Sequence, residues 1–552
     1  FVVANPPFSN KSWSNGLNPT EDLFGRFALG IPPKKNGDYA FLLHLLASMK
    51  STGKGAIVMP HGVLFRGNAE AEIRRNIVKR GYIKGIIGLP ANLFYGTGIP
   101  ACIVVLDKEN AAVRRGVFMI DASRGFVKDG NKNRLRAQDI HRIVSVFNSQ
   151  AEVPGYSHMA TFDEIEQNDF NLNIPRYIDS TEPEDLQDID AHLSGGIPDR
   201  DVDGLAQYWA VFPSLRTELF EPADRPGYSQ LKIPASSVRS TIFGYPEFDA
   251  FNQSVTALFD GWRAAHVRKL KDLGPGHHPR ELISELSESL LSVFRGTPLI
   301  DPYDVYQHLM TYWAETMQDD VYLIVSNGWR EAARLRLMVD VKVGKDKEKP
   351  DITVGKQKYK ADLVPPALII ARYFPDAQAA IDELETRRVA IAQQMDELRD
   401  EQGGEEGLLS SVIDDGKITK GDLTARLREI RGDAEFDDER AVLERYLGLM
   451  DEDSATAREI RDKRAELDAQ LAGKYASLTE DEVKTLVADE KWMGALAADV
   501  QSELHRVSQT LTARILELAE RYKSTLPELV HEVEALASSV DEHLRRMGAV
   551  WS

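Results

Sequence analysis

The sequence has one cysteine, Cys102, and no long run of apolar residues. A single cysteine cannot form an internal disulfide, the usual covalent support of secreted proteins. The longest apolar runs, such as residues 55–59 and 99–106, have the length of a β-strand and are far too short to cross a membrane. No basic and then apolar leader opens the chain. We therefore expect a cytoplasmic protein with no membrane contact.

Metal ligands and a surplus of positive charge are also scarce. His277-His278 lies in a Gly/Pro-rich loop without a carboxylate or cysteine at ligand spacing, so we predict no metal site. The 552 residues include 67 Lys and Arg against 86 Asp and Glu, a net charge of −19. Such a surface as a whole does not bind DNA, because phosphate contacts need a local excess of cations.

The charge is unevenly distributed along the chain. Residues 1–180 hold 22 basic and 16 acidic residues, whereas the remainder holds 45 basic and 70 acidic ones. The two parts are therefore expected to have different partners. An acidic, helix-rich second part can equally be one that is merely well solvated.

Short β-branched runs alternate with amphipathic stretches over residues 1–125. Strands are predicted at Phe1–Ala4, Ala56–Met59, Ile83–Leu89, Cys102–Leu106 and Val117–Ile120. A helix capped by Asp38 and a helix over Ala69–Arg80, with Ile73 and Ile77 inward, separate the first three strands. This order predicts a parallel sheet covered on both faces, with the last two strands as a hairpin at one edge.

We divide the chain into three parts, of which the α/β region at residues 1–180 is the first. Residues 181–375 form a mixed α/β region of unknown role, with a lysine-rich hairpin at about Val339–Lys360. Residues 376–552 are predicted to be helical and coiled-coil-like. The apolar positions of the predicted seam are Ile381, Leu384, Ile391, Met395 and Leu398, then Ile460, Leu467, Leu471, Tyr475 and Leu478. Thr479 and Glu482 fit a capping box.

Asn5-Pro6-Pro7-Phe8 follows directly on the first predicted strand. The lone pair of an exocyclic amino group is delocalised into its ring, which makes that nitrogen a poor nucleophile. An Asn side-chain oxygen and a backbone carbonyl can each accept one N–H bond and favour a pyramidal nitrogen. The prolines stiffen the backbone that presents the Pro6 carbonyl, and Phe8 offers a face for a base rotated out of a duplex. The alternative is a rigid exit from a strand with Phe8 in the core.

With several further motifs in order, the chain resembles the modification subunit of type I restriction–modification systems. The matching stretches are Phe1–Phe8, Gly37–His44, Gly55–Gly67, Leu89–Leu106 and Asp169–Tyr177. The resemblance implies an adenine-N6 DNA methyltransferase using S-adenosylmethionine, with a Rossmann-like sheet of which residues 1–180 are the C-terminal half. The resemblance also implies that Asn5, Pro6, Pro7 and Phe8 are catalytic, and that Asn5 and Pro6 lie beside the cofactor. Thr97–Pro100 resembles a loop beside the pocket, or is only a glycine-rich turn before a strand.

One part of the family pattern is missing from the sequence. The family places a Gly-rich cofactor loop before its Asn-Pro-Pro-Phe segment, and no Gly-x-Gly-x-x-Gly occurs here. We expect that an N-terminal part precedes Phe1 in a longer gene product, and that the present chain alone is inactive and binds the cofactor weakly. Two alternatives stay open: a non-catalytic helical scaffold of a DNA-modifying complex, and a methyltransferase for protein glutamine or RNA.

The helical residues 376–552 also suggest a partner. In the family a separate specificity subunit reads the DNA sequence, and a restriction subunit completes the complex. The resemblance therefore implies that the specificity subunit binds the C-terminal helices and that DNA is contacted through the complex. The alternative is an intramolecular pair in which Asp376–Gly403 folds on Ala455–Leu478.

Overall fold

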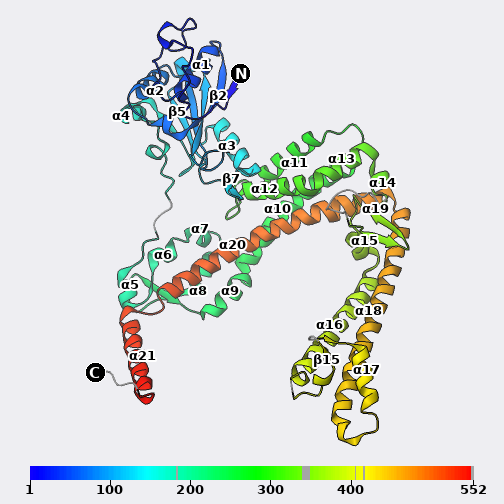
Figure 1. Cartoon of the computed structure of the whole chain (residues 1–552). Helices are drawn as coiled ribbons and strands as arrows, with labels where there is room; N and C mark the ends of the chain where they lie inside the picture. Colours follow the sequence, from blue (N-terminus) through cyan, green and yellow to red (C-terminus); the bar gives the residue numbers. More distant parts are fainter. Residues whose placement is uncertain (182–184, 339–348, 405, 415–416, 549–552) are drawn as a thin grey trace. The chain divides into compact units, whose positions relative to one another are not determined.

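A computed structural model describes residues 1–181, 185–338, 349–404, 406–414 and 417–548 of the chain (Figure 1). The chain divides into two compact units. The first unit is formed by Phe1–Val255, Leu290–Met310 and Glu503–Ser552, and the second by Thr256–Ser289 and Thr311–Ser502. The three-part division at residues 180 and 375 stays a prediction.

A six-stranded mixed sheet is the centre of the N-terminal part of the first unit (Figure 1). Its strands are β1 Val2–Ala4, β2 Lys54–Pro60, β3 Ile83–Gly88, β4 Ala101–Asp107, β5 Gly116–Asp121 and β8 Ser157–Thr161. Their order is β1-β2-β4-β3-β5-β8. Strands β1, β2, β3 and β5 run in one direction, whereas β4 and β8 run in the other.

The predicted arrangement of the last two strands is wrong. Strand β4 inserts between β2 and β3 and pairs antiparallel with both, so it lies inside the sheet and does not pair with β5. The edge next to β5 is taken by β8, which the sequence analysis missed. The sheet is therefore mixed and not purely parallel.

Helices cover both faces of this sheet, as predicted. They are α1 Asp38–Ser48, α2 Ala69–Lys79, α3 Ala137–Ser149 and α4 Phe162–Gln167. On one face, Ile73 and Ile77 of α2 are fully buried with Ile57 and Met59 of β2. On the other face, Phe147 of α3 packs with Phe118 and Ile120 of β5. Each such side chain contributes about 1.5–3 kcal/mol by burial, and together they give the sheet a dry core on each side.

Small helices and a three-stranded antiparallel sheet form the rest of the first unit. These elements are α5 Ile189–Ser194, β9 Ile197–Pro198, α6 Asp199–Asp203, α7 Ala206–Trp209, α8 Pro213–Leu219, β10 Phe220–Pro222, β11 Tyr228–Leu231, α9 Ala235–Phe243 and α21 Leu526–Arg546. The strand order is β10-β11-β9. Helices with residues in both units are α10 Pro246–Lys271, α11 Pro279–Phe294, α12 Pro302–Tyr312 and α20 Met493–Arg521.

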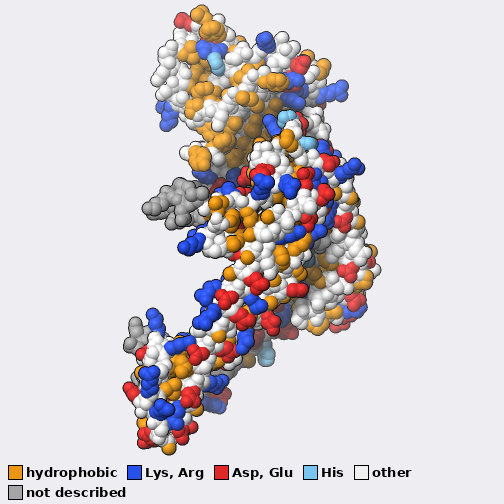
Figure 2. All heavy atoms as spheres, turned by 90° about the vertical axis from the view of Figure 1, so that its right-hand side faces the viewer, with side chains coloured by type: hydrophobic (Ala, Val, Ile, Leu, Met, Phe, Trp, Pro, Cys, Tyr) orange, Lys and Arg blue, Asp and Glu red, His pale blue; other side chains and the backbone are white. Residues whose placement is uncertain are grey.

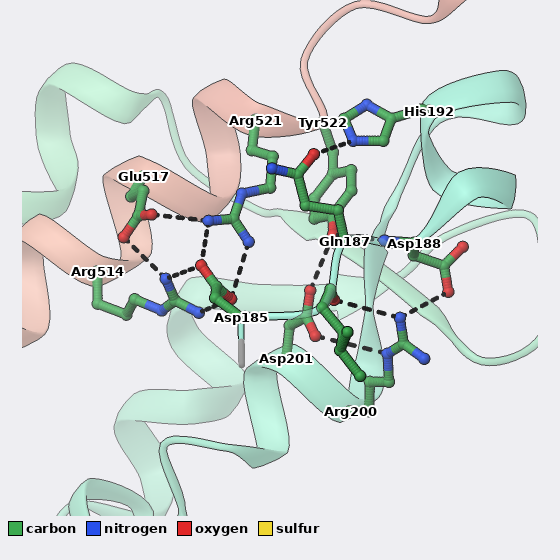
Figure 3. Close-up of polar contacts among 11 residues, drawn as sticks. Asp185, Gln187, Asp188, His192, Arg200, Asp201, Arg514, Glu517, Arg521 and Tyr522 are labelled. Carbon is green, nitrogen blue, oxygen red and sulfur yellow. Dashed lines mark hydrogen bonds and ion pairs between the residues drawn. The ribbon is translucent and has the colours of Figure 1, made fainter. Parts of the chain in front are cut away.

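A charged cluster ties the chain after residue 184 to the end of α20 (Figure 3). The Asp185 carboxylate accepts hydrogen bonds from Arg521 and from Arg514, whose Nη2 lies 2.8 Å away. Hydrogen bonds first from Arg521 and then from Arg514 hold the pKa of Asp185 well below its ordinary value. Tyr522 adds a hydroxyl bond to Asp201 at 3.1 Å. Residues far apart in sequence are thereby joined within the first unit.

The second unit is almost entirely helical. Its helices are α13 Gln318–Asn327, α14 Trp329–Ala332, α15 Pro366–Tyr373, α16 Pro375–Gln402, α17 Lys420–Glu429, α18 Asp437–Ser477 and α19 Glu480–Lys484, with π-helical turns at Trp313–Met317 and Thr485–Trp492. Its strands are β12 Arg336–Leu337, β13 Ile352–Val354 and β14 Gln357–Lys360, with the short pair β15 Ile413–Asp414 and β16 Lys417–Ile418. Of the predicted lysine-rich hairpin, residues 339–348 lie outside the described residues, and β13 and β14 pair antiparallel.

Helices α16 and α18 pack against each other, but only in part at the predicted positions. Ile391 and Leu398 of α16 share a core with Leu443, Tyr446 and Leu449 of α18, which precede the predicted partner segment Ala455–Leu478. Farther along α18, Asp468 accepts a hydrogen bond from the Thr353 N–H of β13, and the Tyr475 hydroxyl donates to the Val364 carbonyl. Ile381, Ile391 and Leu398 of α16 are buried, as are Ile460, Leu467, Leu471 and Tyr475 of α18. Arg387 and Arg388 add ion pairs to Glu452 and Asp453 at 2.7 and 2.8 Å. Acidic and basic side chains are intermixed on the surface of this part (Figure 2). An intramolecular pair of helices is therefore present, but its contacts lie largely before Ala455 and do not extend along the whole predicted partner segment Ala455–Leu478.

Candidate active site

The residues that follow the four parallel strands lie at the same end of the six-stranded sheet, where the carboxyl ends of these strands are found. This end is called the carboxyl edge of the sheet below. Asn5 follows β1, His61 follows β2, Leu89 follows β3 and Ala122 follows β5. Because β4 runs in the opposite direction, the loop Thr97–Pro100 that precedes it reaches the same edge. Ligands of open α/β sheets bind at the carboxyl ends of the strands. The structure therefore brings together the two predicted segments, Asn5–Phe8 and Thr97–Pro100.

The Asn5–Phe8 segment is accessible. Asn5 and Pro7 are exposed, whereas Pro6 and Phe8 are half-buried. Asn5 is thus open to solvent, and Phe8 is only partly enclosed and not a fully buried core residue. Phe8 contacts Phe94 of the loop after β3 with ring centroids 6.0 Å apart and planes at 73°. This edge-to-face contact restrains the Phe8 ring from the side of that loop.

An ion pair between Asp38 and Arg66 fixes the backbone just after the Asn5–Phe8 segment. Ser9 has a left-handed φ of 52°, and its N–H donates to Asp38 Oδ1 at 2.6 Å. Asp38 is 2% exposed, and its Oδ2 accepts a hydrogen bond from Arg66 Nη1 at 2.7 Å. Burial opposes the charge of Arg66, but the carboxylates of Asp38 and Glu70 raise its pKa above the ordinary value. Glu70 Oε1 lies 3.5 Å from Arg66 Nη1.

The role of Asp38 differs from the predicted one. Gly37 is the N-cap of α1, Asp38 is the first helical residue, and its carboxylate bonds the distant Ser9 and Arg66. The tertiary partners outcompete the local capping geometry because they satisfy a buried charge. Ser9 and Arg66 were not predicted as site residues, although Asp38 and Arg66 stand in two of the stretches that carry the resemblance.

A small hairpin supports the loop before β4. The hairpin consists of β6 Val127–Asp129 and β7 Lys132–Arg134. Lys132 Nζ donates to the carbonyl oxygens of Phe94 at 2.9 Å and Thr97 at 3.2 Å. Asn133 donates its side-chain amide to the Ala91 carbonyl at 2.7 Å. The sequence analysis did not find this support, because bonds to backbone carbonyls far along the chain leave no local pattern.

His61 connects the end of β2 to the loop before β4. Its backbone N–H donates to the Pro100 carbonyl at 3.0 Å, and its ring lies 6.3 Å from that of Phe65. Burial lowers the pKa of His61 despite the opposing charge of Asp121. The imidazole is therefore neutral at pH 7 and offers hydrogen bonds without a positive charge.

Two negative findings concern the described residues alone. No group of three or more His, Cys, Asp or Glu residues in the part of the chain described by the structure is placed to hold a metal ion. No helix among those described is long and apolar enough to cross a bilayer.

Cys102 is buried in β4, where burial raises the pKa of its thiol to about 12, so it does not act as a nucleophile at neutral pH.

The six-stranded sheet and the Asn-Pro-Pro-Phe segment at its carboxyl edge lie within a region that resembles a known family. Residues 1–186 match the family described as N-6 DNA Methylase.

Particular relatives are similar to this part of the chain. The MpnII type I restriction enzyme methylase subunit of Mycoplasma pneumoniae is 34% identical over 190 residues, 34% of this chain and 35% of the relative. The HindI methylase subunit of Haemophilus influenzae is 34% identical over 194 residues, 34% of this chain and 43% of the relative. The solved methyltransferase subunit of a Streptococcus thermophilus type I system shares 43% identity over 32% of this chain and 37% of its own, with a TM-score of 0.29.

The predicted resemblance to type I modification subunits is confirmed over this part of the chain. The chain spans between about a third and two fifths of the length of these curated relatives. These relatives are methylase subunits of type I restriction enzymes.

Proposed function

We propose that the chain belongs to an adenine-N6 DNA methyltransferase subunit of a type I restriction–modification complex, which transfers a methyl group from S-adenosylmethionine. The observation that carries this proposal is the exposed Asn5 amide at the carboxyl end of β1, within a segment similar to methylase subunits. We also propose that the six-stranded sheet is part of a Rossmann-like methyltransferase sheet and that α16 and α18 form a coiled-coil-like seam.

The chemistry proposed for the site needs hydrogen-bond acceptors and a stacking face. Asn5 Oδ1 and the Pro6 carbonyl each accept one N–H of the adenine amino group, which localises the lone pair on nitrogen. Pro6 and Pro7 reduce the backbone freedom of the acceptor, so little reorganisation is needed during transfer. Phe8, restrained by Phe94, stacks on the flipped adenine. Once the nitrogen carries the methyl group and a positive charge, its N–H is strongly acidic, and the proton passes to solvent water.

S-adenosylmethionine would supply an electrophilic methyl group. Asn5 and Pro6 are the residues of this chain proposed to lie beside it, because the nitrogen they hold must point its lone pair at the methyl carbon. The exposed amide of Asn5 is compatible with this role, since a packed amide could reach neither donor nor acceptor.

Partners are also part of the proposal. We propose that the specificity subunit binds the C-terminal helices, that a restriction subunit completes the complex, and that the complex brings DNA to the site. Helix α21 supports this, because its apolar residues Leu529, Val533, Leu536 and Val540 recur at three- and four-residue spacing and are 45–65% exposed. The apolar residues at the predicted seam of α16 and α18 are, by contrast, largely buried within the second unit.

The test is methyl incorporation into DNA by the complete reading frame that contains this chain, assayed with the specificity subunit. Asn5→Ala is expected to abolish incorporation, because one acceptor of the amino group is lost. Asn15→Ala is the matched control, since Asn15 is exposed in the same region and its backbone N–H, which the substitution keeps, donates to the Ser12 carbonyl. Incorporation at the control level by Asn5→Ala would refute the site assignment.

A further inference from the structure

The hairpin β6–β7 carries more positive charge than its structural role requires. The hairpin, residues 127–134, contains three basic residues and one acidic residue, and Arg124 and Arg136 flank it, in a chain whose net charge is −19. Lys132 is engaged with the loop carbonyls of Phe94 and Thr97. Arg136 is engaged with Asp139 at 3.0 Å. Lys128 and Arg134 remain on the exposed surface of the hairpin.

The register of the hairpin places these two cations on opposite faces of a narrow ribbon. Lys128 pairs across the strands with Asn133, whereas Arg134 pairs with Val127. Directly opposed residues share a face and successive residues alternate, so the side chains of Lys128 and Arg134 point to different sides. Gly130, with a φ of 59°, begins the two-residue turn that keeps the ribbon short.

The ion pair of Arg134 does not prevent another partner from binding. Arg134 Nε lies 3.4 Å from Asp129 Oδ2, and both side chains are about two-thirds exposed. A pair of this kind in water contributes only about 0–1 kcal/mol, so a phosphate group of a polyanion can replace the carboxylate. A guanidinium binds phosphate oxygens in a bidentate manner, and an ammonium binds them as a point charge.

The position of the hairpin links it to the candidate active site. Its Lys132 and Asn133 hold the loop between residues 91 and 97 by hydrogen bonds, and Phe94 of that loop contacts Phe8. An anion bound by the hairpin therefore lies at the edge of the sheet where the target base is proposed to enter. The backbone of the DNA that carries this base is the polyanion expected there.

We propose that Lys128 and Arg134 bind two phosphodiester groups of duplex DNA beside the flipped adenine. The proposal rests on the function proposed above and adds a DNA contact made by this chain itself. The β-ribbon presents one cation on each side, so the two phosphates flank the ribbon. The hairpin then acts as a phosphate clamp that positions DNA without reading its sequence.

Salt dependence of DNA binding by the full chain tests this proposal. Each phosphate contact contributes about −0.9 to the slope of log affinity against log salt concentration. Lys128→Ala with Arg134→Ala is therefore expected to make the slope less negative by about 1.8. The ratio of the DNA affinity of the unchanged chain to that of the double variant is then expected to fall about twelvefold between 50 and 200 mM salt. The measurement is fluorescence anisotropy with a labelled 20-base-pair duplex.

The matched control is Lys50→Ala with Arg80→Ala. Both residues are exposed, and they precede β2 and β3 at the opposite edge of the sheet, so the same net charge is removed far from the site. Equal slopes for the two double variants, or no DNA binding by the unchanged chain, would overturn the clamp. Asn5→Ala is measured in parallel and is expected to keep the slope. If methyl transfer proves independent of Asn5 while the slopes still differ, the clamp stands and the site assignment fails.

Discussion

Asp38→Ala is expected to loosen the Asn5–Phe8 segment without dissolving the sheet. The Asp38 carboxylate accepts from the Ser9 N–H at 2.6 Å and from Arg66 Nη1 at 2.7 Å. Ser9 follows Phe8 directly, so these bonds determine where the segment leaves β1. Removing the carboxylate leaves a left-handed Ser9 with an unpaired N–H and an arginine without its main anion.

The magnitude follows from these two bonds. A hydrogen bond to a charged group contributes about 1.5–3 kcal/mol when it is buried. Asp38 is buried but the Arg66 side chain is 29% exposed, so the second bond is partly replaced by water. The expected cost of Asp38→Ala is about 2 kcal/mol in the local stability of residues 5–12, which corresponds to a roughly thirtyfold larger population of the open state.

Amide hydrogen exchange of the peptide covering residues 5–12 measures this directly. Asp38→Asn should give a smaller effect, because a neutral acceptor for the Ser9 N–H remains. Asp107→Ala is the control, since Asp107 is also buried and ion-paired, with Arg114, but lies at the far end of β4. Unchanged exchange in Asp38→Ala, together with unchanged methyl transfer, would show that the ion pair does not hold the segment.

Further predictions concern the other parts of the chain. Asp320→Ala should destabilise the second unit by about 3–5 kcal/mol in urea unfolding followed by tryptophan fluorescence, because it leaves the Lys491 ammonium buried without its carboxylate; Asp320→Leu with Lys491→Met should recover most of the loss. Glu482, whose pKa is lowered to about 2 by hydrogen bonds first from Lys474 and then from Thr479, contributes stability that is complete above its ordinary pKa near 4.5 and is lost as pH falls toward 2. Glu482→Gln should flatten this acid limb of the stability profile, and an unchanged limb would contradict the assignment. Leu536→Asp on α21 should abolish co-purification with the specificity subunit, and retained binding would exclude that helix as the interface.

Local patterns in the sequence predicted the elements well. The strands from Phe1 to Ile120 are present with ends shifted by one or two residues. Ile73 and Ile77 are buried as expected from their spacing in α2. The Thr479–Glu482 capping box forms because both of its bonds lie within one turn. These features depend on neighbours that the sequence places side by side.

Pairing between distant segments was not predictable in the same way. Strand β4 lies between β2 and β3 and pairs antiparallel with both, and no short-range pattern in the sequence records which neighbours a strand pairs with. Asp38 gave the same difficulty on a smaller scale, since an acidic residue before an apolar stretch is also the ordinary sign of a helix cap. Its partner Ser9 is 29 residues away.

The candidate site was predicted in part. Asn5–Phe8 and Thr97–Pro100 were recognisable because short motifs at strand ends have a chemical meaning of their own. The support from Lys132 and Asn133 was not, because it consists mainly of bonds from side chains to the carbonyls of a remote loop. Their positions became interpretable only once the hairpin and the loop were seen together.

The most direct test of the proposed function is the identity of the methylated product. DNA modified by the complete reading frame with its specificity subunit is digested to nucleosides and analysed by mass spectrometry after transfer from labelled S-adenosylmethionine. The account predicts that the label is found in N6-methyladenine and that Asn5→Ala removes it. Label in a ring carbon of cytosine, or in protein and not in DNA, would contradict it.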